Sequence, residues 1–356
     1  MNGYPGYTLH QIAPYIGKIR PSLARELVSR YSKRGDWVWD PFSGSGTIPL
    51  ECRLLSRHVI AADLNPYACA LTRAKLHAPA SESIGLRQLN RAADSLRNRP
   101  KEKVQEIPKW VRNFFHHRTL REAKALMNEF VGRRQFFNIG CLLGILHHQR
   151  PGFLSHPASH LVPYLRDRLY PREQYPEAYE YRNPLPRLRA KIRRVLKEQV
   201  PPCVTRFKVF QKSVLDQYLI EASIDAVITS PPYMNALDYA RDNRLRLWFL
   251  GVDDYKVVKE KEIGNISTFN EEMEIALHVI SEVVKPRGAC VLVLGDVRRS
   301  GKTHDAARMI SELVSTRIRS LRLEHRWDEV LPDDRRSRRT GRATRRETIL
   351  VFRREK

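Results

Sequence analysis

The stretch Asp40-Pro41-Phe42-Ser43-Gly44-Ser45-Gly46-Thr47 decides the fold. It follows Trp37-Val38-Trp39, an apolar run typical of a short buried strand, and it precedes a segment from about Ile48 to Leu55 that indicates a helix. Gly44 and Gly46 allow a tight turn and let the backbone approach a ligand that a Cβ would exclude. Free N–H groups at the start of the helix favour a polar or negatively charged ligand.

A second strand and a second helix follow directly and complete a βαβα unit. His58–Asp63 has the pattern of a strand, and 66–77 that of a helix with proline in its first turn. Asp63 ends this strand, where nucleotide-binding α/β units place the carboxylate that holds ribose hydroxyls. GSG lacks the third glycine of the dinucleotide fingerprint, which disfavours a dinucleotide site. The unit predicts the start of a parallel sheet.

The α/β alternation resumes in the last third of the chain. The expected strands cover 206–210, 224–229, 289–294, 325–330 and 348–352, and a helix is expected near 304–319. Thr268 and Glu271 form a capping-box pair for a helix that should stop at Pro286. Residues 79–200 show helical and loop patterns instead, with no clear strand alternation. We therefore divide the chain into a cofactor-binding part (1–78), a helical insertion (79–200) and a catalytic part (201–356).

A second motif, Thr229-Ser230-Pro231-Pro232-Tyr233, also lies at the carboxyl end of an expected strand, the edge where open α/β sheets bind ligands. The two prolines remove two backbone donors and stiffen the chain. Ser230 offers a hydroxyl and Tyr233 an aromatic face. A planar base with an exocyclic amine needs these groups, because its amine hydrogens require acceptors and its ring can stack.

Together, the two motifs resemble those of the S-adenosylmethionine-dependent amino-methyltransferases that act on exocyclic nitrogens of nucleic-acid bases. The SPPY form is most similar to the N4-cytosine DNA methyltransferases, because N6-adenine enzymes more often carry an acidic residue at the position of Ser230. The segment from His10 to Leu27 is similar to the cofactor-closing segment of these enzymes, and MNALDYARDNRLRLWFLG also matches. The resemblance implies a Rossmann-like methyltransferase fold, with a mostly parallel sheet that ends in an antiparallel strand.

The resemblance also implies roles for individual residues. The cofactor-binding set comprises Asp40, Pro41, Phe42, Gly44, Gly46, Thr47, Asp63 and Asn65. The catalytic set comprises Ser230, Pro231, Pro232 and Tyr233, with Ser230 and the Pro231 carbonyl accepting from the target amine and Tyr233 stacking on a flipped base. Relatives often have an acidic residue after the third strand, where this chain has Lys212-Ser213, with Asp216 nearby; this leaves the adenine contact open.

The charge of the chain indicates nucleic acid as a partner. The sequence has 63 Lys and Arg against 39 Asp and Glu, a formal net charge of +24. A polar run in an expected hairpin loop is a candidate for phosphate contact through five arginines: Arg335, Arg336, Arg338, Arg339 and Arg342. The scattered histidines favour no metal site. No stretch has the length of a membrane span, no secretory signal is present, and five scattered cysteines favour free thiols in the cytoplasm.

The leading interpretation is therefore a cytoplasmic enzyme that makes N4-methylcytosine in double-stranded DNA, with 79–200 reading the DNA. N6-adenine methylation and RNA methylation remain alternatives, because the motifs do not separate them. A catalytically silent nucleic-acid binder is disfavoured, because both motifs are intact. The sequence leaves open whether a restriction enzyme is a partner and whether the chain acts as a monomer or a dimer.

Overall fold

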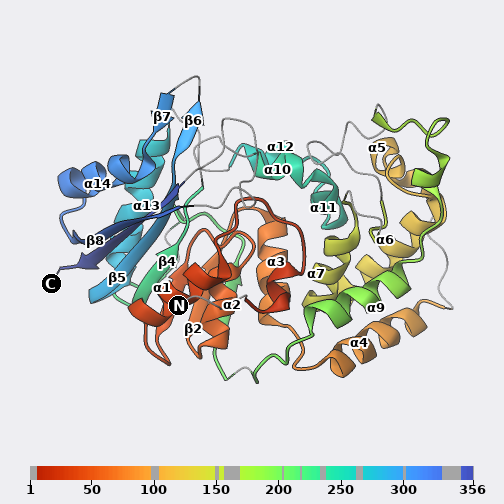
Figure 1. The fold of residues 1–356 in the computed structure, drawn as a ribbon, viewed down its shortest axis with the longest axis horizontal. Coiled ribbons are helices and arrows are strands. Elements are labelled where there is room, and N and C mark those ends of the chain that lie inside the picture. The colour runs from red at the N-terminus through yellow and green to blue at the C-terminus, as the bar shows by residue number, and fades with distance from the viewer. Residues whose placement is uncertain are drawn as a thin grey trace.

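The computed structural model describes residues 6–97, 104–148, 152–155, 169–202, 204–216, 219–232, 238–261, 268–299, 302–330 and 346–355. In this part of the chain the centre is a seven-stranded sheet in the order β3-β2-β1-β4-β5-β9-β8 (Figure 1). The strands are β1 (Trp37–Asp40), β2 (His58–Ala62), β3 (Phe207–Phe210), β4 (Ile224–Thr229), β5 (Val284–Gly295), β8 (Leu321–Val330) and β9 (Arg346–Arg354). A separate two-stranded sheet pairs β6 (Val297–Arg299) with β7 (Lys302–His304).

The strand directions confirm the predicted Rossmann-like methyltransferase fold. Strand β1 pairs in parallel with β2 and β4, β2 with β3, and β4 with β5. Strand β9 runs antiparallel to both β5 and β8. The sheet is therefore mostly parallel, and β9, the last strand along the chain, is its one antiparallel strand among the described residues, as expected.

Successive side chains of a strand point to opposite faces of the sheet, and here both sets are apolar. Helices therefore cover both faces. On one face, Trp39, Val227 and Cys290 pack with α13 (Phe269–Val283) and α14 (Ala306–Arg317). On the other, Val38 and Ala226 pack with α1 and α2. The first three helices of the cofactor part are α1 (Pro21–Tyr31), α2 (Thr47–Leu54) and α3 (Pro66–Leu76).

Two expectations near α13 were wrong in detail. Thr268 is the N-cap residue, but its backbone is helical (φ −109°, ψ −6°) and its side chain makes no capping hydrogen bond. Helix α13 also ends at Val283, before Pro286, and β5 begins at once. A register shift against β4 and a left-handed Arg287 (φ 65°) form an irregularity that accommodates proline inside a strand.

The insertion forms helices, at the right of Figure 1. They are α4 (Glu82–Ser95), α5 (Lys109–Arg112), α6 (His117–Gly132), α7 (Phe136–Ile145) and α9 (Pro184–Val195), with the 3₁₀ turns Val104–Glu106 and Pro176–Tyr179. One hydrophobic core joins Leu142 and Leu188 of these helices to Tyr67 of α3 and to Leu245. The insertion therefore packs directly on the cofactor part. Short helices α10 (Tyr239–Asp242), α11 (Arg244–Phe249) and α12 (Lys256–Lys259) follow β4.

In the described part of the chain, none of the helices combines the length and hydrophobicity that a membrane crossing demands.

The turn after β1 depends on Gly46. This residue has φ +72°, and a Cβ built on it would lie 2.7 Å from Oγ1 and 2.8 Å from Cα of Thr72 in α3. Glycine is thus needed here because the turn lies directly against a neighbouring helix.

We expect Gly46→Ala to lower the free energy of unfolding by about 2–4 kcal/mol, because backbone strain and steric overlap add. Gly35→Ala is the matched control, since Gly35 has φ +86° but no atom within 4 Å of an added Cβ. Gly35→Ala introduces only the backbone strain, which should lower the free energy of unfolding by about 1 kcal/mol. Urea denaturation measures both variants, and equal losses would contradict the assigned contact with α3.

Candidate functional site

The site lies where the strand order reverses, between the adjacent strands β1 and β4. Asp40 ends β1 and Thr229 ends β4. The Thr229 hydroxyl donates to Oδ1 of Asp40 at 2.6 Å and accepts from the Phe42 N–H at 3.3 Å. These bonds join the two sequence motifs, which are 189 residues apart along the chain.

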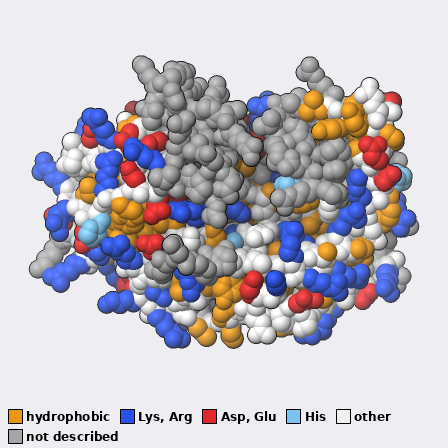
Figure 2. Space-filling model, viewed as in Figure 1, with side chains coloured by type: hydrophobic (Ala, Val, Ile, Leu, Met, Phe, Trp, Pro, Cys, Tyr) orange, Lys and Arg blue, Asp and Glu red, His pale blue; other side chains and the backbone are white. Residues whose placement is uncertain are grey.

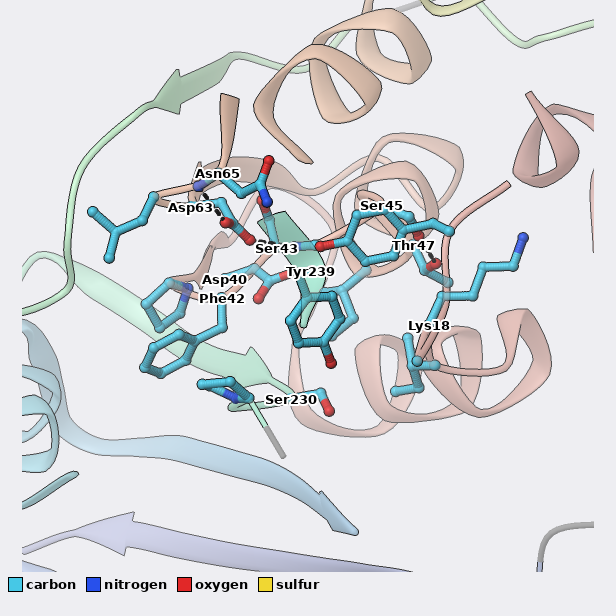
Figure 3. Close-up of a pocket in the computed structure, with 18 of the residues that line it drawn as sticks. Lys18, Asp40, Phe42, Ser43, Ser45, Thr47, Asp63, Asn65, Ser230 and Tyr239 are labelled. Carbon is cyan, nitrogen blue, oxygen red and sulfur yellow. Dashed lines mark hydrogen bonds between the residues drawn. The ribbon is translucent and has the colours of Figure 1, made fainter. Parts of the chain in front are cut away.

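A pocket of about 840 Å³, including the open solvent at its mouth, lies at this edge (Figure 3). Of the predicted cofactor-binding set, seven residues line it: Asp40, Pro41, Phe42, Gly44, Thr47, Asp63 and Asn65. Gly46 is not among the lining residues, because it faces α3. Ser230 and Pro232 line the pocket, whereas Pro231 does not. Tyr233 and the predicted DNA-contacting arginines, Arg335 to Arg342, lie outside the described residues.

The structure adds residues that the sequence patterns did not single out. Tyr15, Lys18 and Tyr239 line the pocket, and the Tyr15 and Tyr239 rings stack at 5.9 Å between centroids with 23° between planes. Both tyrosines lie in segments for which the sequence showed a resemblance but no individual role. Lys212 and Ser213 also line the pocket; Asp216 does not, and instead accepts from the Ser213 N–H.

Asp63 is held by the backbone around it. Its Oδ2 accepts from the Gly44 N–H at 2.8 Å and its Oδ1 from the Asn65 N–H at 2.9 Å. Asn65 in turn caps α3 by accepting from the Tyr67 N–H. Each carboxylate oxygen keeps a further lone pair, so Asp63 can accept hydrogen bonds from a ligand hydroxyl.

Asp40 is buried and Asp63 is partly buried at this pocket, and in the described part of the chain neither carboxyl group forms an ion pair with a Lys or Arg side chain. Burial raises the pKa of Asp40 to about 7; the nearby Asp63 charge raises it further, while hydrogen bonds from Thr229 and Phe42 oppose the shift. Burial likewise raises the pKa of Asp63 to about 6, against the backbone bonds from Asn65 and Gly44. A positively charged ligand would lower both pKa values and stabilise the ionised forms.

These observations fit S-adenosylmethionine. Its sulfonium and ammonium groups are cations, its ribose carries two hydroxyls, and its adenine is flat and aromatic. Asp40 and Asp63 offer the negative charge and the hydroxyl acceptor, and Phe42 and Tyr15 offer rings. In the described chain, no group of three or more His, Cys, Asp or Glu side chains is arranged to hold a metal ion.

Comparisons with known proteins show what the chain is similar to. Residues 14–74 match the family model described as DNA methylase, of N6/N4 type. A type II methyltransferase of Methanocaldococcus jannaschii, M.MjaII, is 31% identical over 26% of this chain and 17% of its own length. M.BsoBI of Geobacillus stearothermophilus is 24% identical over 70% of this chain and 54% of its own length. A solved S-adenosylmethionine-dependent methyltransferase of Corynebacterium glutamicum has 11% identity, covering 95% of this chain and 89% of its own, with a TM-score of 0.35.

The predicted resemblance to the DNA amino-methyltransferases is therefore confirmed, most directly over residues 14–74. S-adenosylmethionine is the cofactor of this class, and the pocket has the groups to hold it. The matched regions span 17% and 54% of the two curated relatives.

We expect Asp40→Asn to stabilise the free protein as the pH rises, while it abolishes cofactor binding. In the unfolded chain the pKa of this carboxyl is near the ordinary value of 3.8, whereas in the folded protein burial raises its pKa to about 7. The parent protein therefore loses stability between these pH values, and the variant does not. The free energy of unfolding of the variant should exceed that of the parent by almost nothing at pH 4 and by at most about 4 kcal/mol above pH 7.

Urea denaturation at pH 5 and pH 8 measures this difference, and calorimetry measures binding of S-adenosylmethionine. A difference in free energy of unfolding that is the same at pH 5 and pH 8 would contradict the raised pKa of Asp40.

Proposed function

We propose that the protein transfers a methyl group from S-adenosylmethionine to the N4 amine of cytosine in double-stranded DNA. The observation that carries the proposal is the shared pocket, in which the carboxylates Asp40 and Asp63 lie beside Ser230 and Pro232 (Figure 3). Two groups that suit the cofactor thus lie next to the motif expected to hold the target amine. The type II methyltransferases among the relatives support DNA as the substrate.

The hydrogen bonding of Ser230 suits an acceptor role. Its hydroxyl donates to the Val293 carbonyl of β5 at 3.0 Å. Because the only hydroxyl proton is used in this bond, the oxygen presents lone pairs to the pocket. The Pro231 carbonyl would supply the second acceptor for the hydrogens of the target amine.

Such acceptors address the difficulty of the reaction. The exocyclic amine is a poor nucleophile, because its lone pair is delocalised into the ring. Acceptors at Ser230 and Pro231 would favour a pyramidal nitrogen with its lone pair directed at the methyl group. The bound cofactor supplies an electrophilic methyl group on sulfur. We propose that the cytosine is flipped out of the duplex and stacks on Tyr233.

The insertion is the proposed DNA-reading region. Lys and Arg side chains are spread over the visible face of the described surface, including the insertion (Figure 2). A second pocket in the insertion, of about 1560 Å³ including open solvent, is lined by Arg97, Arg118 and Arg121 together with Tyr181. The Arg118 guanidinium lies 4.3 Å from the centre of the Tyr181 ring. Arginines beside an aromatic ring suit phosphate and base contacts. The arginines at 335–342 are proposed to bind phosphate as well.

The decisive experiment is mass spectrometry of nucleosides from duplex DNA, and separately from RNA, after incubation with the protein and methyl-labelled S-adenosylmethionine. We expect label in N4-methyldeoxycytidine. Label in N6-methyldeoxyadenosine would overturn the choice of base, label only in RNA would overturn the polymer, and no label in either would overturn the enzyme.

We also expect Ser230→Ala to reduce kcat by about 100-fold or more, because it removes an acceptor that acts on the reacting amine. Its Kd for S-adenosylmethionine should stay within about twofold of the parent value. Asp63→Ala is the reciprocal control, since it should mainly raise that Kd. Single-turnover kinetics with calorimetry separates the effects, and equal losses in both quantities for Ser230→Ala would contradict its role.

A further inference from the structure

Residues 7–20, here called the N-terminal strap, form one wall of the cofactor pocket. Tyr15, Gly17, Lys18 and Ile19 of the strap are pocket-lining residues. The first half of the strap contains the 3₁₀ turn Thr8–Gln11 and lies away from the pocket. What holds this first half in place therefore determines where the pocket wall lies.

Helix α9 of the insertion holds the first half of the strap. The ammonium of Lys191 donates to the Gln11 carbonyl at 2.8 Å, and Lys191 is only 4% exposed. Just beyond α9, Glu198 accepts from the Thr8 N–H at 2.9 Å and from the Thr8 hydroxyl. The bond to Lys191 is the stronger restraint, because its donor side chain is buried, whereas the exposed Glu198 is screened by water.

Helix α7 of the insertion supports the same half by close contact. A Cβ built on Gly144 would lie 2.0 Å from the Ile12 carbonyl oxygen, and one on Gly140 would lie 3.0 Å from the Ile12 side chain. Ile12 is completely buried. The strap thus lies directly against the backbone of α7, with no space for a larger side chain at either glycine.

The cofactor part fixes the strap from the other side. Nε2 of His10 lies 2.8 Å from Oε1 of the fully buried Glu51 in α2, and the Tyr67 hydroxyl donates to the Pro14 carbonyl at 2.6 Å. Gln11, bound by the insertion, and Tyr15, which lines the pocket, are four positions apart. A shift of one would move the other, because so short a segment has little freedom to absorb it.

We propose that Lys191 is a positioning residue for S-adenosylmethionine, which acts by holding the strap and thereby the Tyr15 and Lys18 wall of the pocket. The insertion then contributes to cofactor binding as well as to its proposed role in reading DNA. Preorganisation is the physical reason, since a strap that must be ordered during binding lowers the affinity. The inference rests on the cofactor and not on the identity of the methylated base.

The test is calorimetry of S-adenosylmethionine binding to the full chain, without DNA. We expect Lys191→Met to raise the Kd about tenfold, because it removes the donor that holds the Gln11 carbonyl and with it the strap. Gly144→Ala should raise the Kd at least as much, by displacing Ile12. At saturating cofactor, kcat should stay within about twofold of the parent value, because neither residue touches the pocket.

Two matched controls separate positioning from general stability. Arg193→Met also removes a cation from α9, but Arg193 is exposed and pairs with Glu82 of α4. Gly132→Ala adds a methyl group in the insertion where no atom lies within 4 Å. Both should leave the Kd unchanged. Hydrogen exchange gives a second readout, in which Lys191→Met should reduce protection of amides in residues 7–20 even without cofactor.

A folded Lys191→Met variant with the parent Kd and parent strap protection would overturn the inference, whether or not Gly144→Ala folds. Failure of the parent to bind S-adenosylmethionine would overturn it together with the proposed function. Cofactor binding that responds to Lys191→Met, in a parent that methylates no DNA, would support the inference and overturn only the proposed function.

Discussion

The hydrogen bond from Thr229 to Asp40 is the interaction on which the rest of the site depends. It forms because β1 and β4 are neighbours at the reversal of strand order, so two motifs far apart in sequence end side by side. The Thr229 hydroxyl uses its proton on Asp40 and accepts from Phe42, which fixes the turn after β1. Ser230 follows directly and is fixed in turn by Val293 of the next strand. The spacing between the proposed cofactor-binding residues and the proposed target-binding residues is therefore set by the sheet.

In the same arrangement, ionisation of the two carboxyl groups costs free energy when no ligand is bound. Asp40 is buried and Asp63 is partly buried, and the pKa of each is raised, so neutral pH places negative charge at the base of the pocket. A fold selected for stability alone would replace these residues. Their burial is useful when a cationic ligand binds, because charge attraction is strongest where water is excluded. At Asp40, stability is thus opposed to the proposed role in cofactor binding.

The cofactor pocket is a composite of three parts of the chain. The turn after β1 and the end of β2 form its base, β4 leads to its target side, and the N-terminal strap forms a wall. The strap is bound both by α2 and α3 and by α7 and α9 of the insertion. The insertion also shares one hydrophobic core with α3. It consequently supports one wall of the pocket without lining it, and it is also the proposed DNA-reading region.

The sequence by itself determined the βαβα unit, the positions of Asp40, Asp63 and Ser230 at strand ends, and the class of cofactor. Such features are local, because glycine turns, apolar runs and helix starts depend on near neighbours in the chain. Only the tertiary structure decided that Gly46 is required by Thr72, that Pro286 lies within a strand, and that Lys191 binds Gln11 across 180 residues. Those contacts depend on how helices and strands pack together, and no periodicity or spacing along the chain encodes the approach of two distant segments.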